Sequence, residues 1–455
     1  MRKFFIGLCF LHSLFLFAQN DDSVMIRRIA NDGLLNGKAY DNLHYLTKQI
    51  GGRLTGSPEM VKAEKWGLKV LSETGSEKPR LQECMVPHWV RGGKDQAAAE
   101  YKTTKKTLDI TALGNSLGTG IKGLKAEVLE VKTFDELEKK KDQVKGKIVF
   151  YNYKFNPTFI KTFQSYGDAV KYRGQGASRA ARYGAVAVIV RSMTHSTDNN
   201  PHTGAMNYID SISPQKIPAV AIGLHDADWL SKTLEKEKVD VFLKTNGHFL
   251  PDTIGHNVIG ELRGSEFPDQ IITIGGHLDS WDLAEGAHDD GAGVVQTIET
   301  LRLYRALGYK PKHTIRFVLF MNEENGTRGG EQYAKEAKAK NEKHLLALES
   351  DEGGFTPRGF GFTMSDEQFK KVSNWKELLA PYGATEFTKG GGGSDIGSLE
   401  REFGTPMASL SPDSQRYFDY HHARSDVFEA VNKRELELGA INIAALIYLV
   451  DKYGL

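Results

Sequence analysis

Cysteine is almost absent from this sequence. The 455 residues include only Cys9 and Cys84, and Cys9 lies in an N-terminal apolar segment that we expect to be removed. Cys84 then has no partner in the chain, so no intramolecular disulfide can stabilise the fold. A catalytic thiol is disfavoured as well, because the surrounding "LQECMVPHW" has no glycine or turn signature of a nucleophile.

Net charge is also nearly absent. The chain has 59 basic and 58 acidic residues, and residues 1–18 contain two of the basic ones and none of the acidic ones. The remaining chain therefore has a net charge of −1, which gives no indication of binding to nucleic acid or to an anionic membrane. The basic run "EKKKDQVKGK" is interpreted as a solvated helix face followed by a turn.

Long apolar runs occur only at the N-terminus. "MRKFFIGLCFLHSLFLFAQN" starts with Arg2 and Lys3, continues through an apolar stretch, and reaches the small residue Ala18 at a plausible cleavage point. The run is shorter than the roughly 20 apolar residues that a membrane span needs. We predict a signal peptide at residues 1–18 and a secreted or periplasmic protein without a membrane span.

The rest of the chain has an ordinary globular composition, with 40% apolar and 26% charged residues, and is long enough for two domains. Between residues 114 and 235 short β-rich runs such as "KAEVLEV", "KGKIVFYNY", "AVAVIVRS" and "IPAVAI" alternate with short helical stretches. We predict a β-rich insert domain over 114–235. It would divide the main domain into an N-terminal part, 19–113, and a larger part, 236–455.

The main domain has the pattern of an α/β fold. Apolar, β-branched runs ("HNVIGEL", "DQIITIGG", "HTIRFVLF" and "HLLALES") alternate with helical stretches, and "NKRELELGAINIAALIYLVDKYG" is typical of a terminal helix. Ser57 and Pro58 are a good start for a helix over 58–74. This pattern predicts a mixed, mainly parallel sheet flanked by helices.

Charged residues follow three of these predicted strands. His277 comes after "IITIGG", Glu323 and Glu324 come after "FVLFMN", and Asp351 comes after "LLALES". Ligands bind at the carboxyl ends of strands in open α/β sheets, so these side chains are expected at one rim. Such a cluster is costly through charge repulsion unless cations occupy it.

The residue types suit zinc, which binds imidazole nitrogen and carboxylate oxygen. Asp279, two residues after His277, can hold the other imidazole N–H. Asp289, in "GAHDDGAG", can bridge two metal ions. One of the two adjacent glutamates can bind metal while the other acts as a general base.

Another ligand is expected from the histidine pair in "YFDYHHARSDVF". Either His421 or His422 can serve, and Asp426 could support His422 if the segment turns helically. The run Gly390–Gly393 is not a phosphate loop, because no GK[ST] follows it. We interpret it as a wall of the substrate cleft, with candidate substrate contacts at Gly391, Gly392, Ser394, Asp395 and His421.

Four segments, in order, carry a resemblance to a known family. "GGHLDSWDLAEGAHDDGAG", "NEENGTRGG", "ALESD" and "YHHARSD" resemble the co-catalytic di-zinc exopeptidases of peptidase family M28. "GGRLTGS", "NPHTGAMNY" and "GGGGSDIGSL" narrow the match to a group of carboxypeptidases within it. "VKGKIVFYNY" and "AARYGAVAVIVRS" resemble a protease-associated domain. The resemblance covers nearly all of the mature chain.

The resemblance implies two zinc ions per chain, a cis peptide between Asp289 and Asp290, and a possible homodimer. His277 and Asp351 would hold one ion, and Asp289 would bridge the two. The full set of implied ligands is His277, Asp289, Glu324, Asp351 and His422. It also implies Glu323 as the general base and Asp279 as the residue that orients His277.

The expected activity is hydrolysis, by metal-activated water, of dipeptides or short peptides with a free C-terminus. An aminopeptidase of the same family is the alternative, because these motifs do not fix which terminus is recognised. A non-catalytic binding protein on the same fold and a single-zinc acyltransferase are further alternatives. The complete ligand set and Glu323 argue against both.

Overall fold

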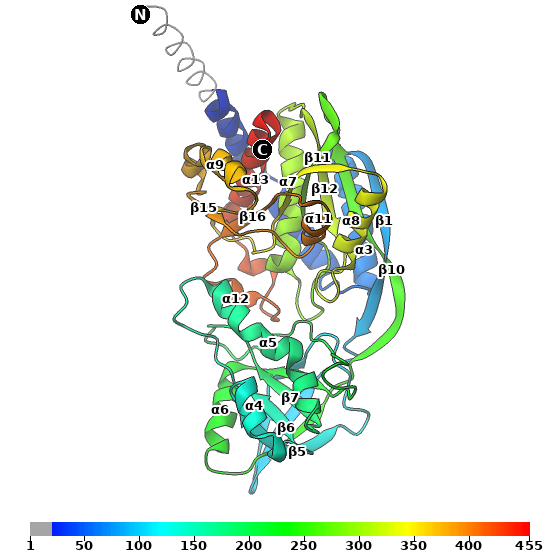
Figure 1. Ribbon diagram of the computed structural model, residues 1–455, viewed down its shortest axis with the longest axis vertical. Coiled ribbons are helices and arrows are strands. Elements are labelled where there is room, and N and C mark those ends of the chain that lie inside the picture. Colours follow the sequence, from blue (N-terminus) through cyan, green and yellow to red (C-terminus); the bar gives the residue numbers. More distant parts are fainter. Residues whose placement is uncertain (1–20) are drawn as a thin grey trace, which may run out of the picture.

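The computed structural model describes residues 21–455, in two parts that are each built on one sheet (Figure 1). The antiparallel strands β1 (Glu77–Val90) and β10 (His248–Leu262) pair with each other at the edge of the first sheet.

The predicted signal peptide at residues 1–18 lies outside the described residues. No helix within residues 21–455 has the length and apolar character that crossing a membrane requires.

The first sheet has the strand order β1-β10-β12-β11-β13-β16-β14-β15. Its remaining strands are β11 (Phe267–His277), β12 (His313–Phe320), β13 (Lys343–Glu349), β14 (Pro357–Thr363), β15 (Glu386–Lys389) and β16 (Met407–Pro412). Strands β12, β11, β13 and β16 are parallel neighbours. Strand β10 pairs antiparallel with β12, and β14 pairs antiparallel with β16 and parallel with β15. The predicted mixed, mainly parallel sheet is confirmed, and the four predicted runs are β10 to β13.

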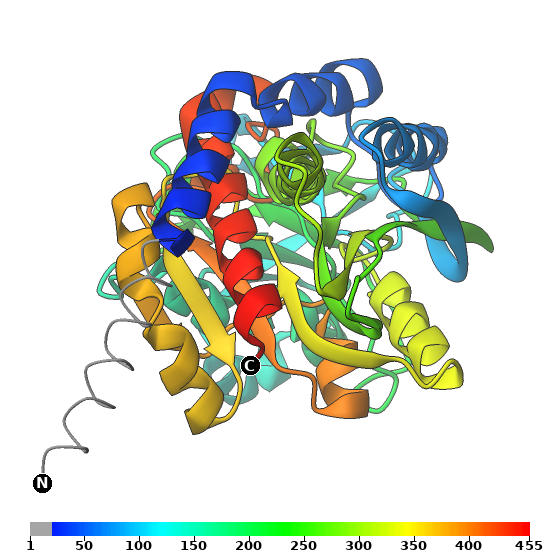
Figure 2. The same ribbon diagram turned by 90° about the horizontal axis from the view of Figure 1, so that it is seen from above.

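Helices cover both faces of this sheet. They include α2 (Ala39–Tyr45), α3 (Pro58–Glu73), α7 (Ala292–Ala306), α8 (Arg328–Ala339), α9 (Asp366–Ser373), α10 (Lys376–Leu379), α11 (Gly397–Phe403) and α13 (Lys433–Tyr453). Figure 2 shows the N-terminal helical segment, in blue, beside α13, in red. Asp22 in that segment accepts a hydrogen bond from Tyr448 at 2.8 Å, which ties the start of the described chain to its last helix.

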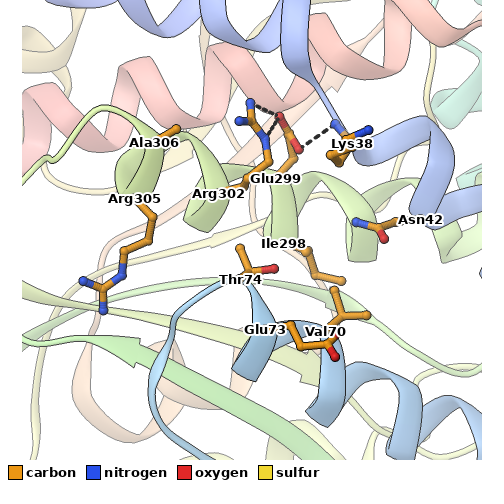
Figure 3. A pocket seen from close by; sticks show the side chains of 10 residues that line it. All are labelled: Lys38, Asn42, Val70, Glu73, Thr74, Ile298, Glu299, Arg302, Arg305 and Ala306. Atoms are coloured by element: carbon orange, nitrogen blue, oxygen red, sulfur yellow. Dashed lines mark hydrogen bonds and ion pairs between the residues drawn. The ribbon is translucent and has the colours of Figure 1, made fainter.

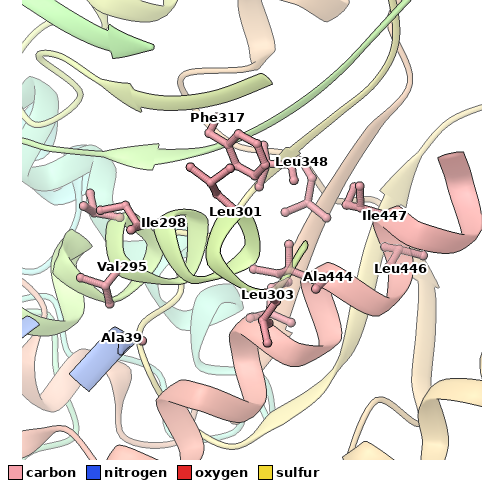
Figure 4. Packing of buried hydrophobic residues seen from close by; sticks show 14 of the residues in the cluster. Ala39, Val295, Ile298, Leu301, Leu303, Phe317, Leu348, Ala444, Leu446 and Ile447 are labelled. Atoms are coloured by element: carbon pink, nitrogen blue, oxygen red, sulfur yellow. The ribbon is translucent and has the colours of Figure 1, made fainter. Parts of the chain in front are cut away.

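Successive side chains of a strand point to opposite faces of the sheet, which explains why apolar residues are buried on both faces. Phe317 and Leu319 of β12 pack with α7 and α13, while Val318 and Phe320 pack with α8 and α11 on the other face. Figure 4 shows the first of these cores, where Leu301 of α7 lies between the sheet and α13. A core on each face holds the strand ends at a fixed position.

The predicted helix starts are confirmed by their caps. The Ser57 hydroxyl accepts the N–H of Met60 at 3.0 Å, and Pro58 is the first residue of α3. Asn432 caps α13 in the same way, by accepting the N–H of Arg434 at 2.9 Å.

The second sheet forms an insert that spans residues 96–244. Its order is β3-β2-β9-β5-β6-β7-β8-β4. The strands are β2 (Gln96–Tyr101), β3 (Thr104–Leu108), β4 (Ile110–Ala112), β5 (Leu124–Val131), β6 (Ile148–Tyr151), β7 (Ala187–Arg191), β8 (Ala219–Ile222) and β9 (Asp240–Lys244), and the helices are α4 (Phe134–Lys139), α5 (Thr162–Ala181) and α6 (Leu224–Leu234). This span is wider than the expected 114–235, because β2, "QAAAEY", lacks the β-branched residues that indicate a strand.

The insert packs against the first part through aromatic side chains. Helix α5 and the short α12 (Tyr417–Tyr420) lie at the boundary in Figure 1. Phe163 stacks on Tyr417 with ring centroids 5.3 Å apart, and Tyr166 stacks on Phe418 at 4.9 Å. The insert is therefore seated directly over the residues that follow β16.

Candidate metal centre

The carboxyl ends of β12, β11 and β13 bring the predicted residues to one rim. His277 is the last residue of β11, and its Nε2 lies 3.3 Å from Asp289 Oδ1 and 3.3 Å from Asp351 Oδ1. Glu323 follows β12, with Oε2 4.0 Å from the same nitrogen. The rule that parallel strands end at one edge therefore located this half of the cluster.

A second histidine approaches from the segment after α12. His422 Nε2 lies 3.3 Å from Asp289 Oδ2 and 3.2 Å from Glu324 Oε2. The two oxygens of Asp289 thus face two different imidazoles. His421 stacks on His422, but its own Nε2 is 3.9 Å from Asp289 Oδ2, so the geometry favours His422 as the closer group.

The converging atoms lack partners. Four of them have no hydrogen bond from any described residue: His277 Nε2, Asp289 Oδ2, Glu324 Oε2 and Asp351 Oδ1. Burial and the neighbouring Asp289 raise the pKa of Glu324 well above its usual range, and burial raises that of Asp351. Buried polar atoms without partners are costly. Cations would satisfy these atoms and offset the repulsion, so the residues fit a metal site.

Asp279 supports the site differently from our expectation. The Nδ1 of His277 lies 2.9 Å from the main-chain oxygen of Asp279 and 3.7 Å from its carboxylate. The carboxylate instead accepts the backbone N–H groups of Glu323 at 3.1 Å and Glu324 at 3.2 Å. The carbonyl therefore orients the imidazole, while the carboxylate fixes the two glutamates.

Asp426 was expected to support His422, and the structure corrects this. Its carboxylate accepts the backbone N–H of His288 at 2.7 Å and of Asp289 at 3.1 Å. His422 has a positive φ of 61°, which breaks the helical turn that the expectation required. The Asp289–Asp290 peptide is cis, as the resemblance implied, and Asp290 accepts the N–H of His277 at 3.0 Å.

Two stretches of the chain match known families. Residues 257–447 match the model of peptidase family M28, and residues 117–230 match that of the PA domain. Carboxypeptidase Q of Mus musculus is 35% identical over 431 residues, covering 94% of this chain and 89% of the relative. The chain belongs to peptidase family M28. It is a peptide hydrolase of the metallo-exopeptidase class.

Solved structures agree with this M28 assignment. The peptidase M28 precursor from Shewanella amazonensis superposes with a TM-score of 0.90 at 32% identity, covering 95% of this chain and 97% of that one. A zinc aminopeptidase from Bacillus subtilis has a TM-score of 0.63 at 20% identity, covering 90% of this chain and 94% of that one, which shows the shared fold.

In this M28 peptidase a cavity of about 270 Å³ opens onto the cluster. The PA-containing insert contributes Phe163, Tyr166, Arg173 and Ala205 to its lining. Arg173 was missed by sequence reasoning, since an arginine within "GDAVKYRGQG" has the pattern of an ordinary solvated helix face. It is buried on α5, and its Nε has no partner among the described residues.

The candidate substrate contacts fall into two groups. Ser394 and His421 line the cavity, whereas Gly391, Gly392 and Asp395 do not. Gly391 pairs with Thr363, whose hydroxyl donates to its carbonyl at 2.7 Å, and Asp395 is fully buried. A glycine run indicates a flexible segment but not which way it faces, so the pattern could not separate these residues.

Glu323 differs from the other carboxylates of this M28 site. Its side chain is 19% exposed, towards the cavity, and burial raises its pKa to about 7, with His277 lowering the pKa and Asp351 raising it. Cys84 does not suit such a role, because it is buried and burial raises the pKa of its thiol to about 12. A carboxylate with these properties suits proton transfer near neutral pH.

Another hollow, of about 520 Å³, lies between α3 and α7 (Figure 3). Its charged groups are already paired: Glu299 accepts hydrogen bonds from Arg302 at 2.8 Å and from the N–H of Lys38 at 3.0 Å. None of the predicted site residues lines it. The cavity over the metal cluster is therefore the candidate site of this M28 peptidase.

Proposed function

We propose that this protein is an exported di-zinc exopeptidase that hydrolyses dipeptides or short peptides with a free C-terminus. The observation that carries the proposal is the position of Asp289, whose two carboxylate oxygens each face a different histidine at 3.3 Å. A carboxylate in this position can bridge two ions about 3.5–4 Å apart. Imidazole nitrogen and carboxylate oxygen are both zinc ligands in catalytic sites.

Five residues would hold the two ions. His277 and Asp351 would bind one, Glu324 and His422 would bind the other, and Asp289 would lie between them. The support is that Glu324 Oε1 accepts the N–H of Trp281 at 3.2 Å, which leaves Oε2 free to face His422. When bound, zinc polarises a water molecule and the scissile carbonyl.

Glu323 would move the proton. Asp279 holds its backbone N–H at 3.1 Å, and its side chain reaches the cavity beside His277. From there the carboxylate can accept a proton from the attacking water and return it to the leaving amine. No serine or cysteine nucleophile is needed for this route.

Arg173 supports recognition of a free C-terminus. It is the only arginine or lysine among the described residues that line the cavity, and its Nη1 lies 3.3 Å from His422 Nδ1. A guanidinium can bind a carboxylate through parallel hydrogen bonds. An aminopeptidase needs instead a group that binds the substrate ammonium, so Arg173 favours the carboxypeptidase. The name of the relative carboxypeptidase Q agrees with this choice.

Metal analysis and a substrate panel test the proposal together. We expect about two zinc ions per purified chain, and hydrolysis of unblocked dipeptides but weak activity on the same dipeptides with an amidated C-terminus. Equal activity on both substrates would identify an aminopeptidase. One ion per chain, with no hydrolysis of any dipeptide, would favour the acyltransferase alternative.

Replacing Arg173 with methionine should lower kcat/KM for a free-carboxylate dipeptide by about 10- to 100-fold, because a hydrogen bond to a charged group contributes about 1.5–3 kcal/mol. The kcat/KM for the amidated dipeptide should change little. Arg179→Met is the matched control, since Arg179 lies on the same helix and bonds Gln175. An equal loss on both substrates, with normal zinc content, would remove Arg173 from terminus recognition.

Replacing His422 with alanine should remove one zinc ion per chain, whereas His421→Ala should keep both. His422 Nε2 is the nitrogen that lies 3.2 Å from Glu324 Oε2, and His421 is farther from Asp289. Loss of a ligand from a bound zinc weakens its affinity strongly. Atomic absorption on the dialysed variants measures this, and the reverse pattern would assign the ligand to His421.

Export and assembly are also proposals. The N-terminal sequence pattern supports removal of residues 1–18, and the family resemblance supports a homodimer. N-terminal sequencing of the protein recovered outside the cytoplasm should begin near Gln19. Light scattering of the purified protein should give twice the mass of the chain.

A further inference from the structure

A buried loop of the insert pairs directly with the two histidines. Thr203 donates its N–H to the main-chain oxygen of His422 at 2.9 Å, and His422 Nδ1 lies 3.3 Å from the oxygen of Thr203. The neighbouring His202 places its Nδ1 2.8 Å from the oxygen of His421. Residues 202–204, here called the insert loop, thus contact both the backbone and the ring of His422.

The contact with the Thr203 carbonyl favours the tautomer of His422 that carries its proton on Nδ1. Two groups approach Nδ1: the oxygen of Thr203, and Nη1 of Arg173 at 3.3 Å. A guanidinium has no acceptor, so the carbonyl is the group that can receive an Nδ1–H. With the proton on Nδ1, the lone pair of Nε2 points towards Asp289 and Glu324.

The backbone contact holds an unusual conformation. His422 has a φ of 61°, in the left-handed region that residues other than glycine rarely adopt. Such a conformation persists where surrounding structure determines it. The hydrogen bond from Thr203 to the oxygen of His422 is part of that surrounding structure, and it comes from the insert rather than from the M28 domain.

The insert loop is itself firmly anchored. The Thr203 hydroxyl donates to Ala112 at 2.8 Å, and the N–H of Gly114 donates to Gly204 at 3.0 Å. Gly204 has a φ of 119°, and a Cβ there would lie 2.5 Å from His422 Nδ1 and 2.4 Å from Arg173 Nη1. The close approach of loop and histidine therefore requires glycine at this position.

We propose that the insert loop is a positioning element of the metal site: it holds His422 ready to bind its ion. The proposal rests on the function proposed above. It gives the insert a role beyond covering the cavity. The contacts of the insert loop reach His421 and His422 but not His277 on the other side of the site. Disturbing the loop should therefore weaken one ion and spare the other.

Titrating cobalt into the metal-free protein tests this role of the insert loop. Calorimetry and the visible absorption of the bound ion measure the binding. The wild type should bind two ions. Gly204→Ala should keep the affinity for the first cobalt ion. Its affinity for the second ion should fall by about 10- to 100-fold, as is typical when the supporting partner of a metal ligand is lost. The absorption band of the bound cobalt should also change. Gly146→Ala is the matched control, because Gly146 has a φ of 75° and no atom near its Cβ.

Thr203→Val is the second variant, should Gly204→Ala fail to fold. It removes only the bond to Ala112, whose oxygen still accepts Arg91 Nη1 at 2.7 Å, so no buried acceptor is left unpaired. We expect several-fold weaker binding of the second ion. A wild type that binds fewer than two ions would overturn the proposed function. A wild type that binds two, with the folded variants matching it in affinity and spectrum, would overturn the role of the loop.

Discussion

Replacing Glu323 with glutamine is expected to lower the rate of peptide hydrolysis by about 10²- to 10⁴-fold while both metal ions stay bound. Glutamine keeps the shape of the side chain and the N–H that Asp279 holds at 3.1 Å, but it cannot accept a proton from water. General base catalysis contributes about 10²- to 10⁴-fold, so kcat should fall by that factor. Steady-state rates on an unblocked dipeptide, with zinc measured on the same sample, check both halves of this prediction.

Two further variants make the result specific. Glu323→Asp keeps the carboxylate but withdraws it from the cavity, and we expect an intermediate rate. Glu331→Gln removes an exposed glutamate that pairs with Arg328 at 3.2 Å, and it should leave the rate unchanged. Full activity in Glu323→Gln would exclude this residue as the base. Loss of zinc in that variant would show that it acts as a ligand.

The strand-end residues were predictable from sequence for a physical reason. Apolar runs such as "IITIGG" fix where a buried strand ends, and parallel neighbours end at one edge of the sheet. His277 is the last residue of β11 and Asp351 follows β13, and the two strands are adjacent, so the 3.3 Å approach of the two side chains is a consequence of the sheet order. Two short local patterns were therefore enough to place two distant residues together.

The supporting residues were not predictable in this way. The expectation for Asp426 assumed helical spacing from His422, and the left-handed backbone of His422 breaks that spacing. Arg173 lies on a helix whose sequence does not reveal which neighbour it meets, and Thr203 acts through main-chain atoms. Their roles arise from the docking of the insert, which brings together residues more than 200 positions apart.

Replacing Asp289 with asparagine should have an even broader effect than loss of any single histidine. Its Oδ1 faces His277 and its Oδ2 faces His422, each at 3.3 Å, so one substitution alters both halves of the site. Asparagine retains one acceptor oxygen, but it removes the negative charge and turns an N–H₂ group towards one ion. We expect less than one zinc per chain after dialysis, and a rate below detection, because no ion then remains to polarise water.

The substitution should leave the fold intact, which separates metal loss from unfolding. Asparagine at this position keeps the backbone N–H that Asp426 accepts at 3.1 Å, and it is nearly the same size as the native aspartate. The melting temperature of the variant should match that of wild type stripped with a chelator, and added zinc should raise the melting temperature of wild type alone, since a ligand stabilises only the state that binds it. Asp282→Asn, at an aspartate paired with Arg91 at 2.8 Å, is the control that should behave as wild type towards zinc. Two tightly bound ions in Asp289→Asn would show that the ions do not share this carboxylate, and the two-ion geometry would have to be assigned to other groups.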